Sequence, residues 1–197
     1  MFTGIIEQTA EVISLTGLKL TVERPLKWQN DLQLGESISV NGCCLTLTNC
    51  QDDLQFDLSE ETVQRTALGT YSPRDLVNLE RSMAANGRFG GHIVQGHVDA
   101  VGKWTAEETK EGSRVLTFFA PAPFGKYMIE KGSIAVDGIS LTLYDLAPTT
   151  SGTSFLVSII PTTWINTNLH RKKVGTPVNL EFDLVAKYVE RLLPSSQ

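Results

Sequence analysis

Apolar and polar residues alternate in twos along most of the chain, and the same pattern occurs twice. Residues 35–48 read GESISVNGCCLTLT, and residues 131–144 read KGSIAVDGISLTLY. In each copy an Asn-Gly or Asp-Gly pair separates two alternating runs. This arrangement is typical of a β-hairpin, because a type I′ turn needs positive φ at both central residues. We therefore predict one hairpin turn at 41–42 and a second at 137–138.

Both copies continue with matching segments. Val77–Glu80 returns as Val178–Glu181, and Thr3–Glu7 has a weaker counterpart in Gln95–Asp99. We expect the later elements of the two copies to be strands over 54–58 and 155–159, short helices over 61–68 and 163–169, and strands over 75–79 and 177–182. About six short strands and one small helix per half favour an antiparallel barrel or a sandwich. A repeat of about 100 residues has the size of a small domain.

Three regions follow from this pattern. The first copy is assigned to residues 1–87 and the second to 88–184, with the join near 84–91. Residues 185–197 lie outside both copies and begin with apolar residues at i, i+3, i+4 and i+7, which predicts an amphipathic helix. These are Val185, Tyr188, Val189 and Leu192. We expect this helix to contact a neighbouring subunit; the alternative is a lid on its own domain.

Composition narrows the class of protein. With 41% hydrophobic and 20% charged residues, the 197-residue chain resembles an ordinary globular protein. A net charge of −5, with no basic run longer than Arg171–Lys173, argues against nucleic acid as a partner. No stretch reaches the roughly 18–20 apolar residues of a membrane span. The N-terminal segment contains Glu7 and Glu11 and no basic residues, which is unlike a signal peptide. The three cysteines are not spaced as in a disulfide framework or a zinc site, so we expect a cytoplasmic protein with free thiols.

Cysteine and histidine are the first candidates for chemistry. Cys43 and Cys44 should point to opposite faces of their strand, so only one of them can reach a given pocket. It could be a polarisable nucleophile or simply a small buried hydrophobe. His92 and His97 also fall on opposite faces of a regular strand, which disfavours a shared metal ion. Each could be structural, although histidine is the side chain best suited to proton transfer near neutral pH.

Other polar residues carry weaker signals. Lys131, Asp137, Glu181 and Asp183 fall at strand ends or turns, and each one alone is interpreted as a solvated charge. Serine and threonine residues of the strands could bind a polar heterocycle: Ser37, Ser133, Ser140, Thr46 and Thr142. From the residues alone, the chain is interpreted as a duplicated small barrel that binds a ligand.

Seven strings, in order along the chain, point to a specific family. They are MFTGIIE, VNGCCLTLT, VNLER, GGHIVQGHVD, DGISLTL, IIPTT and VNLEFD, which together resemble the riboflavin synthase family of the alpha-subunit type. The resemblance implies an all-β fold of two six-stranded antiparallel Greek-key barrels in tandem, with a C-terminal helix that assembles a homotrimer. It also implies a dismutation of two 6,7-dimethyl-8-ribityllumazine molecules by transfer of a four-carbon unit. The products are riboflavin and 5-amino-6-(D-ribitylamino)uracil, and no cofactor or metal is added.

The resemblance also implies site residues, with the site between the N-terminal barrel of one subunit and the C-terminal barrel of its neighbour. The residues expected to act in catalysis are Phe2, Ser37, Cys44, His97, Asp137 and Asp183. Those expected to bind substrate are Gly4, Ile5, Ile6, Cys44, Leu45, Thr46, Asp57, Leu58, Ser59, Glu60, Glu61, Thr62, Gly96, His97, Val98, Lys131, Ser140, Leu141, Thr142, Ile160, Pro161, Thr162, Thr163, Trp164 and Ile165.

The repeat sets unlike residues at equivalent positions. Cys44 aligns with Ser140, so the two pockets should be alike in shape and different in chemistry. We hypothesise that a base removes a proton from the C7 methyl group of one lumazine, and that Cys44, Ser37 or water adds to C7 of the other. His97 is the candidate proton shuttle, and Lys131 the candidate for binding a ribityl or carbonyl oxygen.

Two other functions compete with this interpretation. A non-catalytic lumazine or flavin carrier would share the fold, but the resemblance implies that carriers lose residues equivalent to Cys44, Leu45, His92 and His97, all present here. An oligonucleotide-binding barrel would need exposed aromatic and basic strands, which the acidic charge disfavours. Association with a lumazine synthase shell stays open as a further partner.

Overall fold

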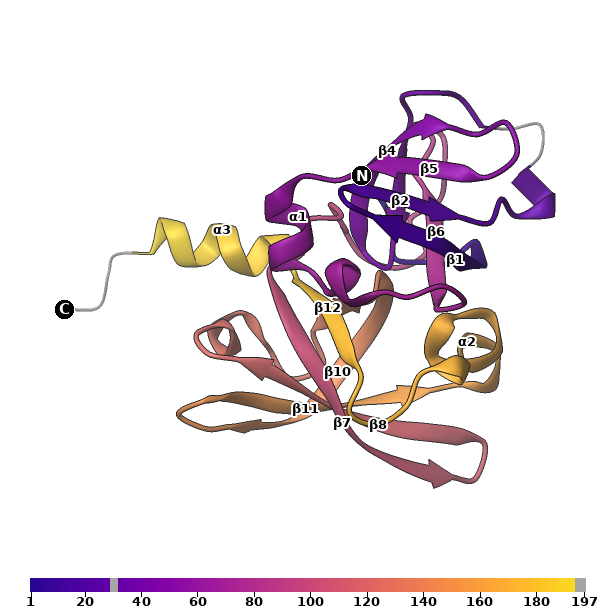
Figure 1. Cartoon of the computed structure of the whole chain (residues 1–197). Coiled ribbons are helices and arrows are strands. Elements are labelled where there is room, and N and C mark those ends of the chain that lie inside the picture. The colour runs from indigo at the N-terminus through magenta and orange to yellow at the C-terminus, as the bar shows by residue number, and fades with distance from the viewer. Residues whose placement is uncertain (29–31, 194–197) are drawn as a thin grey trace.

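Two closed six-stranded antiparallel barrels follow one another along the chain (Figure 1). The computed structural model describes residues 1–28 and 32–193. The first barrel has the strand order β1-β2-β5-β4-β3-β6, and its strands are β1 Gln8–Thr16, β2 Lys19–Val22, β3 Ser37–Val40, β4 Cys43–Asn49, β5 Leu54–Asp57 and β6 Leu76–Arg81. Strands β3, β4 and β5 form consecutive hairpins, and β2, which precedes them in the chain, lies beside β5. This connection is a Greek key.

The second barrel repeats this arrangement. Its order β10-β11-β8-β7-β12-β9 is the same ring when each strand is matched to its counterpart. The strands are β7 Ala100–Lys110, β8 Ser113–Pro121, β9 Ser133–Val136, β10 Ile139–Pro148, β11 Gly152–Ile159 and β12 Pro177–Phe182. The predicted fold of two tandem six-stranded barrels is confirmed.

The hairpin turns form as the sequence predicts. Asn41 and Gly42 have φ of 45° and 78°, and Asp137 and Gly138 have φ of 47° and 78°. The two turns also meet, since a Cβ at Gly42 would lie 2.7 Å from the backbone nitrogen of Gly138. The barrels therefore touch at equivalent points and are related by an approximate twofold axis.

The predicted helices are each divided in two. Instead of 61–68, the chain forms α1 Glu60–Arg65 and the 3₁₀ turn η2 Ala67–Thr70, with Thr66 extended between them at φ −124° and ψ 164°. The Thr66 hydroxyl donates to the carbonyl of Thr62 and accepts from the amide of Leu68, so it caps both pieces. Instead of 163–169, the second copy forms α2 Pro161–Asn166 and η4 Asn168–Arg171 around Thr167. The further 3₁₀ turns are η1 Leu26–Trp28 and η3 Phe124–Tyr127.

Each barrel encloses its own hydrophobic core, because alternate strand residues point inward. Leu45 and Leu47 are buried while Thr46 is exposed between them, and β10 follows the same pattern. Trp28 and Phe56 are among the buried residues of the first core, and Trp104 and Phe118 among those of the second. The predicted strand at 75–79 begins at Leu76 instead, since the Asp75 carboxylate accepts the Ser72 amide in the preceding turn.

Two segments connect the barrels, which we call the first arm (residues 1–7) and the second arm (residues 93–99). They pair antiparallel with each other: Phe2 N donates to Val94 O at 2.7 Å and Val94 N donates to Phe2 O at 3.1 Å. Phe2, Val94 and Ala135 form a third, small buried cluster, against which Cys44 packs. The arms thus lie between the two cores.

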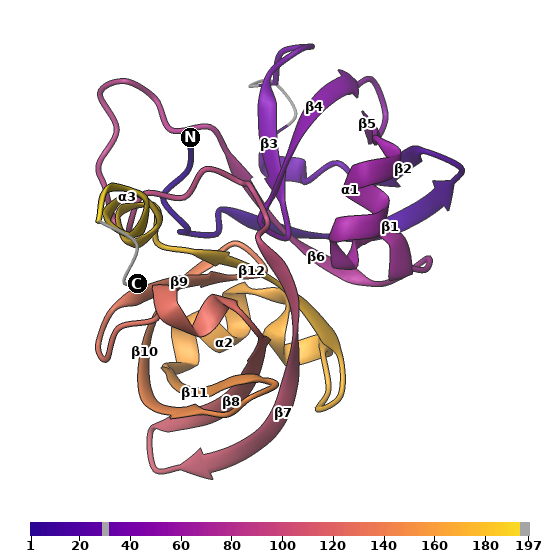
Figure 2. The same cartoon turned by 90° about the vertical axis from the view of Figure 1, so that its left-hand side faces the viewer.

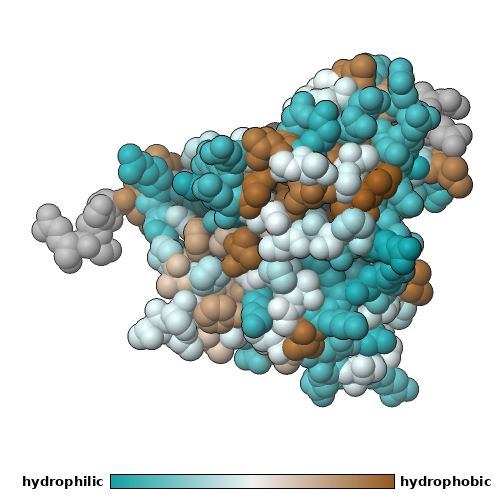
Figure 3. Space-filling view, viewed as in Figure 1, coloured by the Kyte–Doolittle hydropathy of each residue, from teal (hydrophilic) through white to brown (hydrophobic). Residues whose placement is uncertain are grey.

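The predicted C-terminal helix is present as α3 Leu184–Leu192, which extends from the body of the molecule in Figure 1 and is seen end-on in Figure 2. Its Glu190 pairs with Lys126 of the C-terminal barrel. Its apolar residues are exposed, with Tyr188 at 62% and Leu192 at 81%. In Figure 3, apolar residues also lie in patches over the N-terminal barrel, between hydrophilic ones. Among the described residues no helix is long and apolar enough to cross a membrane.

Candidate active site

The two arms exchange between the barrels. The first arm leads into β1 of the N-terminal barrel but lies against β10 of the C-terminal barrel, where the carbonyl of Gly4 accepts from the amide of Ser140 at 2.8 Å. The second arm leads into β7 and lies against β4, where the carbonyl of Gly96 accepts from the amide of Cys44 at 2.8 Å. Each closed barrel is therefore contacted by the arm of the other copy.

Glycine is required at both contacts. Gly4 has φ of +77° and Gly96 has φ of +80°, a conformation that side chains other than glycine rarely adopt. A Cβ at Gly4 would lie 2.6 Å from the Cβ of Ser140, and one at Gly96 would lie 2.6 Å from the Cβ of Cys44. The glycines let the arms approach the barrels closely, and the residues after Gly4 line a pocket.

Two buried glutamates hold the arms. Glu80 of β6 accepts the amides of Thr3 and Gly4 at 2.6 and 3.0 Å. Glu181 of β12 accepts three consecutive amides, of residues 95–97, at 2.6, 2.9 and 3.0 Å. Burial raises the pKa of both carboxyls, although these hydrogen bonds oppose the shift. The interpretation of Glu181 as a solvated charge is wrong: the second arm covers it, and it is 3% exposed.

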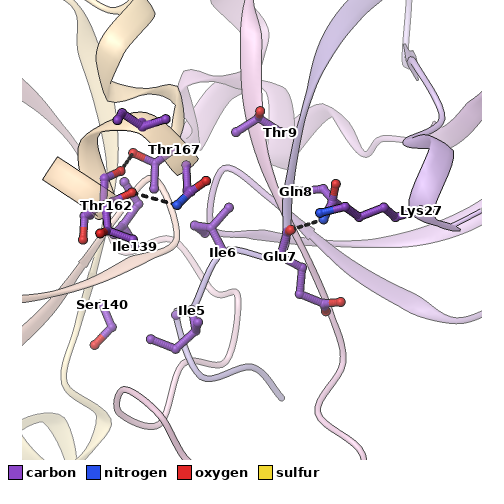
Figure 4. A pocket seen from close by; sticks show the side chains of 14 residues that line it. Ile5, Ile6, Glu7, Gln8, Thr9, Lys27, Ile139, Ser140, Thr162 and Thr167 are labelled. Carbon is purple, nitrogen blue, oxygen red and sulfur yellow. Dashed lines mark hydrogen bonds between the residues drawn. The ribbon is translucent and has the colours of Figure 1, made fainter.

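A pocket of about 400 Å³ opens where the first arm meets the C-terminal barrel. Figure 4 shows Ile5 and Ile6 directed toward the space that Thr162 borders, with Lys27 of η1 across it on the N-terminal barrel. Seven residues expected to bind substrate line this pocket: Gly4, Ile5, Ile6, Ser140, Thr162, Thr163 and Ile165. Seven others that line it were not foreseen: Glu7, Gln8, Thr9, Lys27, Ile139, Asn166 and Thr167.

A histidine and a serine form a hydrogen-bonded pair beside this pocket. His92 Nδ1 lies 2.7 Å from the Ser140 hydroxyl. His92 Nε2 is buried and has no hydrogen-bond partner among the described residues. Burial lowers the pKa of His92, partly offset by the charge of Asp183, so the neutral imidazole is favoured at neutral pH. Of the two, Ser140 lines the pocket, and His92 lies behind it.

The preceding glycine makes the His92–Ser140 contact feasible. A Cβ at Gly91 would lie 2.2 Å from the carbonyl oxygen of Thr3 and 2.8 Å from the Ser140 hydroxyl. His92 was not among the residues predicted for the site, because a lone histidine carries no signal for its partner 48 positions away. The Gly-Gly-His string was the available clue.

The equivalent place on the N-terminal barrel presents Cys44. This side chain is half-buried, whereas Cys43 on the opposite face is buried, as the strand geometry predicts. Burial raises the pKa of the Cys43 thiol to about 12, so Cys43 is not an anion at neutral pH. His97 follows Gly96 on the arm and is exposed, and Val98 packs against the N-terminal core as Ile6 packs against the C-terminal core.

The remaining residues expected around Cys44 divide between surface and core. Leu45 and Leu58 are buried in the N-terminal core, and Thr46 is exposed. Ser59 is the N-cap of α1, where its hydroxyl accepts the amide of Thr62 at 3.0 Å. The exposed carboxylates of this segment are Asp57, Glu60 and Glu61.

Several residues expected near the C-terminal pocket do not line it. Leu141 is buried in the barrel core, and Trp164 packs edge-on against Trp104 with ring centroids 6.3 Å apart. The guanidinium of Arg114 lies 4.2 Å from the Trp164 ring centroid, on the surface side. The other residues of this set are exposed: Lys131, Thr142, Ile160 and Pro161.

The residues expected to act in catalysis occupy unlike environments. Phe2 is fully buried beside Cys44. Ser37, on β3, is half-buried and pairs with Thr46 of the neighbouring strand β4. Asp183 is the N-cap of α3 and accepts the amide of Val185 at 2.9 Å. Asp137 is 0% exposed, so its interpretation as a solvated charge is wrong; it lies where the two barrels meet. No group of three or more potential metal ligands occurs in the described part of the chain.

Comparison with known proteins identifies the family. The model of the lumazine binding domain matches twice, at residues 3–82 and 95–183, which correspond to the two barrels with their arms. The riboflavin synthases of Mycobacterium bovis and Mycobacterium tuberculosis are 48% identical to this chain over 202 residues, covering 100% of both sequences. The chain belongs to the riboflavin synthase family. It is accordingly an enzyme of the transferase class.

A more distant relative supports this assignment, and solved structures support the fold. The riboflavin synthase of Bacillus subtilis is 41% identical and covers 98% of this chain and 90% of its own length. LumP in complex with riboflavin has a TM-score of 0.82 at 20% identity, over 92% of this chain and 99% of that one. LumP in complex with 6,7-dimethyl-8-(1'-D-ribityl) lumazine has a TM-score of 0.80. At this identity the similarity establishes the fold.

Proposed function

We propose that the protein converts two molecules of 6,7-dimethyl-8-ribityllumazine into riboflavin and 5-amino-6-(D-ribitylamino)uracil by transfer of a four-carbon unit. The observation that supports the proposal is the exchange of equivalent arms: one arm lies against Cys44 of β4, and the other lies against Ser140 of β10, which pairs with His92. Two sites of one shape suit two copies of one substrate. Their different side chains supply the asymmetry that makes one copy the donor and the other the acceptor.

The residues suggest a division of roles. A base removes a proton from the C7 methyl group of one lumazine, and Cys44, Ser37 or water adds to C7 of the other. The resulting carbanion attacks the activated partner. His97 is proposed to shuttle protons at the Cys44 site, and the His92–Ser140 pair to do so at the other. Orienting two flat substrates can contribute about 7–11 kcal/mol of the barrier reduction.

We infer that the complete site lies between the N-terminal barrel of one subunit and the C-terminal barrel of the next in a homotrimer. Two features support this arrangement. Val185, Tyr188, Val189 and Leu192 of α3 are exposed in the single chain, and the 400 Å³ pocket beside the first arm is open rather than enclosed. We propose the cytoplasm as the compartment, because all three cysteines are free thiols.

The test uses purified protein and 6,7-dimethyl-8-ribityllumazine without any addition. We expect one riboflavin for every two lumazines consumed, followed by absorbance and product separation. Tight binding with altered lumazine fluorescence and no riboflavin would instead identify a carrier. The roles are tested by Cys44→Ser, Ser37→Ala and His97→Gln: wild-type turnover in all three would refute the assignment of nucleophile and proton shuttle.

A further inference from the structure

A second cleft lies between the barrels, apart from the pocket described above. It has a volume of about 620 Å³ and shares no lining residue with the 400 Å³ pocket. The N-terminal barrel contributes the loop before β6, and the C-terminal barrel contributes the equivalent loop before β12. The lining residues are Thr70, Tyr71, Arg74, Asp75, Leu76, Arg171, Lys172, Lys173, Thr176 and Pro177.

Cations outnumber carboxylates at this cleft, although the whole chain has a net charge of −5. Four basic side chains line it, and one carboxylate, Asp75, accompanies them. Two of the cations have partners. Lys172 binds the buried Asp137, and Arg171 lies 3.5 Å from Glu11 in an exposed pair, which contributes little and is easily exchanged for another anion.

The other two cations, Arg74 and Lys173, have no partner. Neither side chain makes a hydrogen bond or an ion pair with any of the described residues. They come from opposite barrels and both border the same cleft. Two uncompensated cations across one hollow create a positive potential that attracts an anion.

The backbone of Arg74 gives independent support. Arg74 has φ of +77°, a conformation in which an arginine is strained and a glycine is not. Its counterpart in the second copy is Gly175, with φ of +98°. The two loops are otherwise alike: the amide of Arg74 donates to Val12 O at 2.8 Å, and that of Gly175 donates to Trp104 O at 2.7 Å. The arginine therefore carries a conformational cost, and its side chain makes no hydrogen bond or ion pair within the described chain that would offset it.

We propose that this cleft binds a phosphate group, held by Arg74, Arg171 and Lys173 from both barrels. Guanidinium groups bind phosphate oxygens in a bidentate manner, and lysine adds a point charge. The cleft is larger than a single phosphate ion, and the Tyr71 ring forms part of its wall. The ligand class is thus a phosphomonoester of a small molecule, with inorganic phosphate as the simpler source of the same chemistry.

The test is isothermal titration calorimetry of the full chain at low salt, with inorganic phosphate and glucose 6-phosphate as probes. Arg74→Gly is the decisive variant, because glycine suits the backbone and the fold is retained. We expect this variant to be at least as stable as wild type and to lose about tenfold in phosphate affinity. Lys173→Ala should weaken binding as well, whereas Lys110→Ala, outside the cleft, should not.

The two probes separate the sources. Tighter binding of glucose 6-phosphate assigns the cleft to a phosphorylated small molecule, and equal binding assigns it to free phosphate. Absence of binding of both probes at millimolar concentration, or unchanged affinity in folded Arg74→Gly, would overturn the proposal. Because riboflavin formation is measured separately, these results do not depend on the proposed reaction.

Discussion

Asn41 and Asp137 occupy equivalent hairpin turns, but their side chains have different partners: the amide of Asn41 bonds to a tyrosine hydroxyl, and the carboxylate of Asp137 binds a lysine. The Oδ1 atom of each accepts the amide of a strand asparagine in its own barrel, at 2.6 and 2.8 Å. The second side-chain atom differs. Asn41 Nδ2 donates to the Tyr71 hydroxyl at 2.6 Å, whereas Asp137 Oδ2 accepts from the Lys172 ammonium. Tyr71 and Lys172 are themselves equivalent, so the pair has changed together.

This relationship predicts the outcome of exchanging the pair. Asp137→Asn should cost about 3–5 kcal/mol of unfolding free energy, because Lys172, 10% exposed, is left without its counterion. The double variant Asp137→Asn/Lys172→Tyr removes the unpaired cation and should recover part of that loss; recovery is incomplete because Asn168 Nδ2, which donates to Asp137 Oδ2 at 3.1 Å, then faces an amide nitrogen. Urea denaturation of both single variants and the double variant measures the coupling. A double variant no more stable than Asp137→Asn would contradict the explanation.

The same variants separate two roles for Asp137. If Asp137 only positions the barrels, the restored double variant should also recover turnover. Recovered stability without recovered turnover would mean that the carboxylate itself takes part in the chemistry, as the family resemblance implies. The two readouts together therefore decide between a structural and a catalytic Asp137.

Local signals predicted the elements, and contacts between the copies decided the site. Asn-Gly and Asp-Gly located both hairpins, because their φ requirement is a property of two adjacent residues. The repeated Val-Asn-Leu-Glu string was visible, but the function of its glutamates was not. Glu80 binds an arm 77 positions away, and only the packing of the two copies buries it.

The limits of the site prediction have the same origin. Ile5 and Thr162 were expected at the C-terminal pocket and line it, whereas Lys27 was missed because it approaches from the other barrel. His92 was a candidate for chemistry but was not assigned to the site, because its partner Ser140 lies 48 positions away on β10. A sequence pattern describes the periodicity of one segment. These contacts join two segments that are far apart in the sequence, so no pattern within either segment predicts them.

The close approach of the second arm predicts a difference between two glycine substitutions. Gly96 and Gly112 have nearly the same φ, +80° and +76°, but a Cβ at Gly112 meets nothing within 4 Å. Gly112→Ala should therefore cost only the backbone strain, about 1–2 kcal/mol. Gly96→Ala should cost about 1–3 kcal/mol more, because its Cβ collides with Cys44. Equal losses in urea denaturation would show that the arm can move aside.

The buried arm carboxyls predict a pH dependence. A carboxyl with a higher pKa in the folded than in the unfolded protein stabilises the fold fully below its unfolded pKa, and that stabilisation is lost as pH rises through the folded pKa. Burial raises the pKa of Glu80 above 4.5. The stability advantage of wild type over Glu80→Gln should therefore shrink as pH rises from about 4 to neutrality.

The control for the pH experiment is Glu60→Gln, on the exposed side of α1. Denaturant titrations at several pH values, run on both variants, separate burial from the loss of one charge. If the stability difference between wild type and Glu80→Gln instead grows as pH rises, the hydrogen bonds from the amides of Thr3 and Gly4 affect the pKa of Glu80 more than its burial does. The pKa of Glu80 would then be lowered in the folded protein rather than raised.

The exposed apolar face of α3 predicts that assembly and turnover fail together. Tyr188 and Leu192 are adjacent on the helix and exposed in the single chain, so replacing both with glutamate should leave the barrels folded. If α3 joins subunits and each site needs two of them, sedimentation velocity should show monomers and riboflavin formation should fall at least about tenfold. Arg191→Glu changes the charge of the helix by the same amount and is the matched control. A double variant that remains oligomeric and active would remove α3 from the interface, whereas a monomer with full turnover would remove the shared site itself.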